Sequence, residues 1–127
     1  MLDIDNFKSI NDQFGHPTGD AVLKDFASRL KAELRETDLI ARVGGEEFAI
    51  ILINADMNTG KNVANKIRKS IEENTFGIDN QAIKITVSIG ITLLDSKLNS
   101  YEEAYKYADR ALYTAKMKGK NRVEMSG

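Results

Sequence analysis

Two apolar segments separated by four residues constrain the fold of this chain more than any other feature. Residues 39–43 (LIARV) and 48–53 (FAIILI) are rich in β-branched and aromatic side chains, a composition that is typical of β-strands. The residues between them, GGEE, begin with two glycines that suit the tight turn of a hairpin. The sequence therefore predicts a β-hairpin. Its second strand is apolar on both faces, which indicates a central position in a sheet.

The rest of the chain alternates between strand and helix patterns. Residues 1–4 (MLDI) indicate the end of a buried strand, and residues 122–125 indicate a last short strand. Residues 83–93 place six apolar side chains on one face, which predicts a long strand whose other face is polar or partly exposed. Four helices are predicted where apolar residues recur every three or four positions. Their apolar stripes are, in chain order, Phe7, Ile10 and Phe14; Val22, Leu23, Phe26, Ala27, Leu30 and Leu34; Val63, Ala64, Ile67 and Ile71; and Ala104, Ala108, Ala111, Leu112 and Ala115.

Local signals indicate where the helices begin. Asp5 is expected to cap the first helix, and residues 15–20 (GHPTGD) are expected to form a turn because they contain the only proline. Ser100 and Glu103 predict a capping box at the start of the last helix. The element order is then β-α-α-β-β-α-β-α-β. This order favours one α+β domain over residues 1–127, with a mostly antiparallel central sheet flanked by helices, of ferredoxin-like type.

Composition excludes several classes of protein and site. The chain has no cysteine, which excludes disulfides and cysteine-based zinc sites. A net charge of -1 argues against a partner that is a nucleic-acid polymer, because phosphate binding needs a basic face. The strand predicted at 83–93 also lacks the aromatic residues that a ferredoxin-like RNA binder would use. No apolar run reaches the roughly 20 residues that span a bilayer.

Four acidic residues are expected to lie at one end of the sheet. Asp3 and Asp5 lie at the end of the first strand, and Glu46 and Glu47 lie in the hairpin turn. In a ferredoxin-like sheet the first strand lies beside the hairpin, so that the carboxylates of Asp3 and Glu46 would converge. Such carboxylates repel each other unless a cation is present, and they suit Mg²⁺ (or Mn²⁺), which also accepts phosphate oxygens. The alternative is a hairpin tip with solvated acids.

Four stretches of the chain together carry a family resemblance: MLDIDNFKSINDQFGHPTGD (1–20), RVGGEEF (42–48), VSIGI (87–91) and ADRALYTAKMKGKNRV (108–123). On these motifs the chain resembles the GGDEF domain, the catalytic module of diguanylate cyclases. The resemblance implies a nucleotide-cyclase-like fold, of which the N-terminal part of the first strand is expected to be missing here. It also implies a Mg²⁺-dependent reaction, in which two GTP molecules condense to cyclic di-GMP and release two pyrophosphates. A homodimer would be required, because each subunit would hold one GTP.

The resemblance implies roles for individual residues. The metal ligands would be Asp3, Glu46 and the carbonyl oxygen of Ile4. Glu47 would hold a second metal or deprotonate the 3′-hydroxyl, and the catalytic candidates are Glu46, Glu47 and Lys8. The implied substrate-binding residues are Phe7, Lys8, Asn11, Asp20, Gly45, Lys116 and Lys120.

These roles have simpler alternatives. Asn11 and Asp20, the candidates for reading guanine, could instead cap turns and helix ends. Lys8 could be a solvated side chain, and Lys116 and Lys120 could complement the dipole at the end of the last helix. Lys120 also stands where the family usually has arginine, so that charge is kept and bidentate geometry is lost.

A second site is expected at residues 35–38 (RETD), which match the RxxD product-binding site of the family. Arg35 can form a fork with phosphate or guanine, and Asp38 can accept guanine N–H groups. Lys66 stands where the family often adds a second arginine. Cyclic di-GMP would then act as a feedback inhibitor. The alternative is an arginine at a helix end beside a solvated aspartate.

The resemblance also sets expectations for the surroundings. The chain is expected to be an N-terminally truncated domain of a longer protein with an upstream sensor domain. Its catalytic domain is expected in the cytoplasm, whether or not the parent chain is membrane-anchored. The rival to catalysis is a catalytically silent GGDEF module that binds GTP or cyclic di-GMP as a regulatory sensor.

Overall fold

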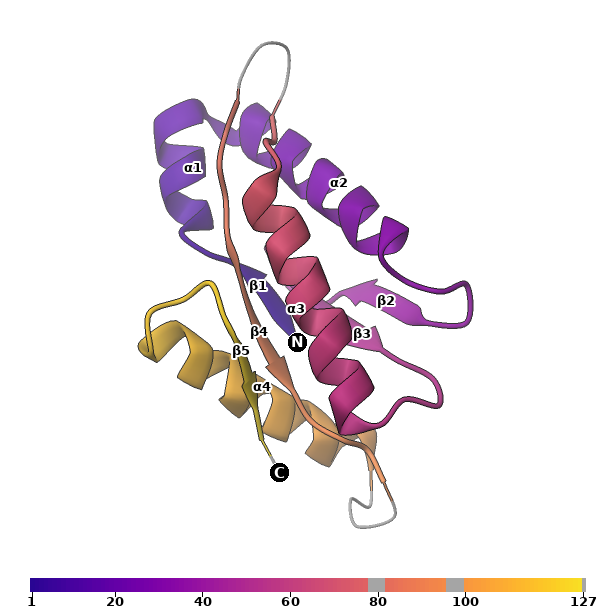
Figure 1. The fold of residues 1–127 in the computed structure, drawn as a ribbon. Coiled ribbons are helices and arrows are strands. Elements are labelled where there is room, and N and C mark those ends of the chain that lie inside the picture. Colours follow the sequence, from indigo (N-terminus) through magenta and orange to yellow (C-terminus); the bar gives the residue numbers. More distant parts are fainter. Residues whose placement is uncertain (78–81, 96–99, 127) are drawn as a thin grey trace.

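A five-stranded sheet forms the centre of the protein (Figure 1), with the strand order β2-β3-β1-β4-β5. The computed structural model describes residues 1–77, 82–95 and 100–126. The elements are β1 (Leu2–Ile4), α1 (Phe7–Phe14), α2 (His16–Ala32), β2 (Leu39–Arg42), β3 (Glu47–Ile51), α3 (Met57–Glu73), β4 (Val87–Ile91), α4 (Tyr101–Met117) and β5 (Val123–Met125). This element order confirms the predicted one.

Strand β1 is the middle strand of the sheet. It pairs antiparallel with both β3 and β4, and β2 pairs antiparallel with β3, whereas β4 and β5 are parallel. The predicted hairpin and the mostly antiparallel α+β sheet are therefore confirmed. Strand β3 is an interior strand as expected, although β1 occupies the centre.

One face of the sheet carries the main apolar core. Leu2 pairs with Phe48 and Ile89, and Ile4 pairs with Val87. Paired residues share a face, so these side chains all point toward α2 and α3. Figure 1 shows α3 lying across this side of the sheet. The helices contribute buried residues at the predicted spacing, namely Val22, Leu23, Phe26, Leu30, Ala64, Ile67 and Ile71.

The opposite face is covered by α4, and this corrects the prediction for residues 83–93. The strand is only Val87–Ile91, and Ile83 forms just an isolated bridge with Phe76. Its second face is not exposed, because a Cβ on Gly90 would lie 2.2 Å from the Leu112 amide nitrogen and 2.3 Å from the Ala108 carbonyl oxygen. The backbone of α4 therefore rests directly on β4. Periodicity could not reveal this, because the covering residues are small.

Two predicted helix boundaries were wrong, and one was confirmed. Residues 16–20 are not a turn, because α2 begins at His16 with Pro17 in its first turn, where a missing N–H costs nothing. Asp5 does not cap α1; Asn6 holds that position in a left-handed conformation, and Asp5 is buried. The Ser100 hydroxyl accepts a hydrogen bond from the Glu103 amide at 3.2 Å, as the capping box predicts.

No helix in the described part of the chain combines the length and the apolar character that crossing a membrane requires.

Candidate active site

Asp3 lies in the middle of the sheet, on the face that α4 covers. Its register partners are Glu47 on β3 and Ser88 on β4, so the three side chains share that face. The side chain is buried, and its Oδ2 atom lies 2.7 Å from Nζ of Lys116, near the end of α4. The other oxygen, Oδ1, has no hydrogen-bond partner among the described residues. A buried carboxylate oxygen without a partner is costly unless another group binds it.

The environment of Asp3 disfavours its charged form. Burial raises the pKa of Asp3 to about 6 from its ordinary value of 3.8. Lys116 opposes this shift through its hydrogen bond and charge, and the neighbouring Glu46 and Glu47 carboxylates add to it. The carboxyl group is therefore poised to gain a cation or a proton.

The hairpin tip is fixed against β1, as predicted for the first strand and the hairpin. The amides of Val43 and Gly44 donate to the Glu47 carbonyl, and the Ile4 amide donates to the Glu46 carbonyl at 3.4 Å. These contacts hold the backbone of both acidic residues beside the end of β1. Carboxylates distant in the sequence thus become neighbours.

Arg42 braces the same turn, a role that no local sequence pattern indicated. Its Nε donates to the carbonyls of Gly44 and Gly45 at 3.1 Å each, and its Nη2 donates to Gly45 at 2.6 Å. A guanidinium that holds two successive carbonyls restricts a turn that glycine would otherwise leave mobile.

A cavity of about 310 Å³ opens between α1, α2 and the hairpin tip. Its lining residues are Phe7, Lys8, Asn11, Asp20, Leu23, Arg42, Gly45 and Glu46. The fold therefore brings predicted residues from three segments to one cavity, with cationic, amide and acidic groups around an apolar base.

Gly19 allows α1 and α2 to approach each other at this cavity. A Cβ at this position would lie 1.8 Å from Oδ1 of Asn11. Asn11 and Asp20 are thus held on adjoining helices. This role was not predicted, although a glycine directly before the candidate residue Asp20 could have indicated a close approach there.

Two of the predicted substrate-binding residues, Lys116 and Lys120, lie near the end of α4, outside the lining of this cavity. Lys116 contacts Asp3, as described above, and Nζ of Lys120 donates to Oδ1 of Asn6 at 2.6 Å. Lys116 therefore lies beside β1, and Lys120 lies beside the short segment that joins β1 to α1. This segment also carries Asp5, whose carboxylate accepts from the Thr86 and Ser88 hydroxyls at 2.6 Å each.

The donor set at the end of β1 fits a hard divalent cation. Within the described ranges, no three histidine, cysteine, aspartate or glutamate side chains are grouped closely enough to hold a metal by themselves. Mg²⁺ needs only one or two carboxylates, because water and phosphate oxygens complete its shell. The unpartnered Oδ1 of Asp3, next to the hairpin acids, meets that requirement.

The residues of the predicted product site lie at the far end of the β2–β3 hairpin. Arg35 and Asp38 form an ion pair at 3.0 Å; Arg35 also donates to the Ile53 carbonyl, and Asp38 accepts from the Ile53 amide. The hydrogen bond from Arg35 lowers the pKa of Asp38. Lys66, on α3, lies 3.6 Å from Glu33 at the end of α2. Asp38 is not the solvated residue of the alternative interpretation, because its side chain is only 3% exposed.

A larger cavity, of about 520 Å³, lies elsewhere, between α3, α4 and the ends of β3 and β4. Its lining is mainly apolar and includes none of the predicted site residues. Size alone would favour it as a ligand site. The smaller cavity is the better candidate, because charged and polar groups from several segments converge there.

Comparison with known proteins identifies the family. The model of the family described as "Diguanylate cyclase, GGDEF domain" matches residues 1–122. Diguanylate cyclase A of Treponema denticola is 44% identical over 126 residues, which cover 99% of this chain and 34% of that protein. Diguanylate cyclase DgcP of Pseudomonas aeruginosa is 41% identical over 126 residues, covering 99% of this chain and 19% of that protein. The chain thus spans about a third or less of the length of these curated relatives.

Solved structures agree with this assignment. The active GGEEF domain of a diguanylate cyclase from Vibrio cholerae superposes with a TM-score of 0.92 at 38% identity, covering 99% of this chain and 80% of that one. The GGDEF domain of DgcB from Caulobacter crescentus, solved in complex with c-di-GMP, gives 0.90 at 34% identity, covering 98% and 74%. The chain belongs to the GGDEF domain family, and the two curated relatives described above are named diguanylate cyclases.

Proposed function

We propose that this chain is a diguanylate cyclase module that condenses two GTP molecules to cyclic di-GMP. The single observation that carries the proposal is the gathering of predicted residues around one cavity, namely Phe7, Lys8, Asn11, Asp20, Gly45 and Glu46. The charge of Glu46 also reaches the buried Asp3, whose pKa it raises. In each half-reaction a 3′-hydroxyl oxygen bonds to the α-phosphorus of the other GTP. The bond from that phosphorus to the pyrophosphate breaks, and the hydroxyl proton leaves to a base. Two such steps close the ring and release two pyrophosphates.

The chain's own residues bind and orient the nucleotide. Asn11 and Asp20 read the guanine edge, because an amide can pair with it and a carboxylate can accept from its N–H groups. Lys8, Lys116 and Lys120 neutralise phosphate charge. The backbone at Phe7 and the side-chain-free Gly45 permit close approach of the nucleotide. This positioning supplies most of what phosphoryl transfer requires.

Asp3, Glu46 and the Ile4 carbonyl would hold Mg²⁺ or Mn²⁺. When bound, the cation neutralises phosphate charge and polarises the α-phosphate. Glu47 either holds a second cation or accepts the proton of the 3′-hydroxyl. Lys116 already offsets the charge of Asp3 at 2.7 Å, so it can turn to phosphate when the carboxylate gains another partner.

The reaction needs two copies of the chain, because one cavity holds one GTP and each nucleotide attacks the other. An upstream sensor domain in a longer parent protein would control how two modules meet, and GTP would be supplied from the cytoplasm. Cyclic di-GMP would inhibit the reaction by binding at Arg35, Asp38 and Lys66. It would have to compete with the Arg35–Asp38 ion pair and with Glu33.

Incubation with GTP and Mg²⁺, followed by measurement of pyrophosphate and chromatography of the products, tests the proposal. Glu46→Ala is expected to abolish turnover while the circular dichroism spectrum stays unchanged. Glu73→Ala, which removes an exposed acid at the end of α3, is the matched control and should retain full turnover. Unchanged turnover in Glu46→Ala would contradict the proposal. Binding of GTP by the wild-type dimer without pyrophosphate release would favour a regulatory nucleotide-binding module instead.

A further inference from the structure

The loop that follows α4 has an unusual backbone. Three successive residues have positive φ angles, Gly119 at 125°, Lys120 at 64° and Asn121 at 45°. Glycine adopts this region freely, whereas the same conformation costs lysine and asparagine conformational energy, and lysine more than asparagine. Such a conformation persists only when the surroundings enforce it.

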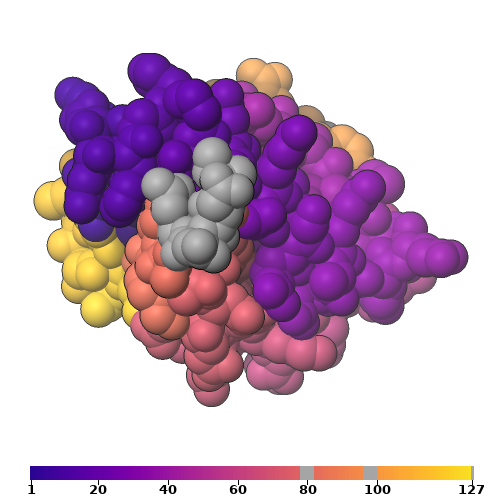
Figure 2. Space-filling view, turned by 90° about the horizontal axis from the view of Figure 1, so that it is seen from above, coloured from indigo at the N-terminus to yellow at the C-terminus, as the bar shows by residue number. Residues whose placement is uncertain are grey.

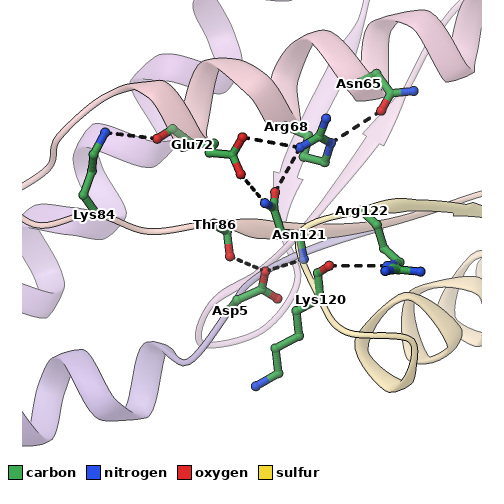
Figure 3. A network of polar contacts seen from close by, with 9 residues as sticks. All are labelled: Asp5, Asn65, Arg68, Glu72, Lys84, Thr86, Lys120, Asn121 and Arg122. Carbon is green, nitrogen blue, oxygen red and sulfur yellow. Dashed lines mark hydrogen bonds and ion pairs between the residues drawn. The ribbon is translucent and has the colours of Figure 1, made fainter.

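The buried carboxylate of Asp5 provides the first constraint. Its Oδ2 accepts a hydrogen bond from the Asn121 backbone amide at 3.0 Å (Figure 3). Asp5 is itself immobilised, because the hydroxyls of Thr86 and Ser88 both donate to it. The loop is thereby tied to the end of β1 and to β4, elements distant from it in sequence.

The side chain of Asn121 provides the second constraint. Its Oδ1 accepts from Nη1 of Arg68 at 3.1 Å, and its amide nitrogen donates to Glu72. Arg68 and Glu72 lie one turn apart on α3 and form an ion pair at 3.8 Å. Figure 3 shows Asn121 between this pair and Asp5. One asparagine therefore joins α3, β1 and the loop.

The same loop places Lys120 beside Asn6, the residue that directly precedes α1. Its ammonium donates to Asn6 at 2.6 Å, and Asn6, also left-handed at φ 57°, directly precedes the cavity residues Phe7 and Lys8. In Figure 2 the C-terminal segment, in yellow, lies against the indigo N-terminal segment. Two left-handed corners thus meet at the start of α1.

We propose that Asn121, held by Asp5, Arg68 and Glu72, is a positioning residue that sets the Lys120 ammonium where the triphosphate of the nucleotide enters. This proposal rests on the proposed function, because it needs a nucleotide in that cavity. It adds a role for three residues, Asp5, Arg68 and Glu72, that contact no nucleotide themselves.

Chemical labelling tests the position of Lys120 without any nucleotide. Acetylation by a limiting amine-reactive ester, read by peptide mass spectrometry, should modify Lys120 more slowly than Lys118, which is 57% exposed. In Asn121→Ala the Lys120 rate should rise to that of Lys118, because alanine is strained at φ 45° and lacks both side-chain contacts. Asn121→Gly relieves the strain and loses only the side-chain contacts, so it serves if the alanine variant fails to fold. An unchanged Lys120 rate in a folded variant would overturn the proposal.

A double-mutant cycle tests the consequence for binding. The probe is the α,β-methylene analogue of GTP with Mg²⁺, which cannot release pyrophosphate, and its affinity is measured by calorimetry. Lys120→Ala and Asn121→Ala should each weaken binding roughly ten- to a hundredfold, as expected for a lost contact to a charged group. Together they should weaken binding no more than about twofold beyond Lys120→Ala alone, since both remove the same interaction.

Lys118→Ala is the matched control, because Lys118 lies in the same loop and pairs with Glu124. Its effect should add to that of Asn121→Ala. Additive losses of affinity for Lys120→Ala and Asn121→Ala would show that Asn121 affects binding independently of Lys120, and would overturn the proposal. If the wild-type chain fails to bind the analogue, the proposed function fails, and the labelling result still decides whether Asn121 positions Lys120.

Discussion

The two faces of the sheet are built in opposite ways. The face toward α2 and α3 is filled by large apolar side chains, among them Phe26 and Phe48, whose ring centroids lie 5.2 Å apart. The face toward α4 has a smaller apolar cluster, made of Met1, Ala49, Ala108 and Leu112, and Gly90 lies directly under the helix backbone. Large side chains hold a helix away from a sheet, whereas small ones let it approach. We call the face toward α2 and α3 the thick face and the face toward α4 the thin face. On the thin face, Lys116 at the end of α4 reaches Asp3 of β1.

The largest effect is expected on the thick face. Phe26→Ala should lower the free energy of unfolding by about 3–5 kcal/mol, because Phe26 is fully buried and its loss leaves a cavity. Phe14→Ala is the matched control, since Phe14 is exposed at the end of α1, and it should change stability far less. Urea denaturation of both variants measures the difference. Equal losses would show that burial does not set the contribution of Phe26 to stability.

A smaller loss of stability is expected on the thin face, where it comes from adding a group and not from removing one. Gly90→Ala should destabilise the protein by about 1–3 kcal/mol, because the added methyl group meets the backbone of α4, which cannot move aside as a side chain would. Gly60→Ala, in α3, is the control, since a Cβ added there would meet nothing within 4 Å. It should stabilise by about 0.5–1 kcal/mol, because glycine is a poor helix former. The same denaturation experiment distinguishes them, and a stable Gly90→Ala variant would show that α4 can shift away.

The thick face was predictable from sequence, whereas on the thin face only the buried stripe of α4 was. Residues such as Val22, Phe26, Ile67 and Ile71 recur at helical spacing and are buried as that spacing indicates. Gly90 and Ser88 carry no comparable signal, so the second face of β4 was expected to be polar or partly exposed. Burial there comes from tertiary approach of a helix backbone, which no local pattern encodes.

The candidate site likewise contains residues that the sequence indicated and residues that it did not. The motif residues that line the cavity, such as Asn11, Asp20 and Glu46, were identified from sequence, and the fold places them together. The residues that brace them were missed or misassigned, among them Arg42, Gly19 and Asp5. Arg42 acts through the carbonyls of Gly44 and Gly45 in its own turn, a geometry that the turn conformation creates. Asp5 accepts from the backbone amide of Asn121, a partner distant in the sequence that only folding brings near. The left-handed Asn6 and Asn121 had a weak signal, since asparagine tolerates that conformation.

The third effect concerns the single carboxyl group of Asp3 on the thin face, where Lys116 partly offsets the burial. The pKa of Asp3 is about 6 in the folded protein against 3.8 ordinarily. Between these two values the folded state holds a proton that the unfolded chain has released. Stability should therefore fall as the pH rises through this window and stay lower at neutral pH.

Asp3→Asn cannot ionise and should lack this fall, whereas Asp12→Asn, which removes an exposed carboxylate on α1, should follow the wild type. Urea denaturation from pH 4 to 7 measures the slopes (about one-unit steps suffice for a shift of this size). Parallel curves for Asp3→Asn and the wild type would mean that water reaches the carboxylate in solution, and that the thin face is less closed than the approach of α4 to Gly90 requires.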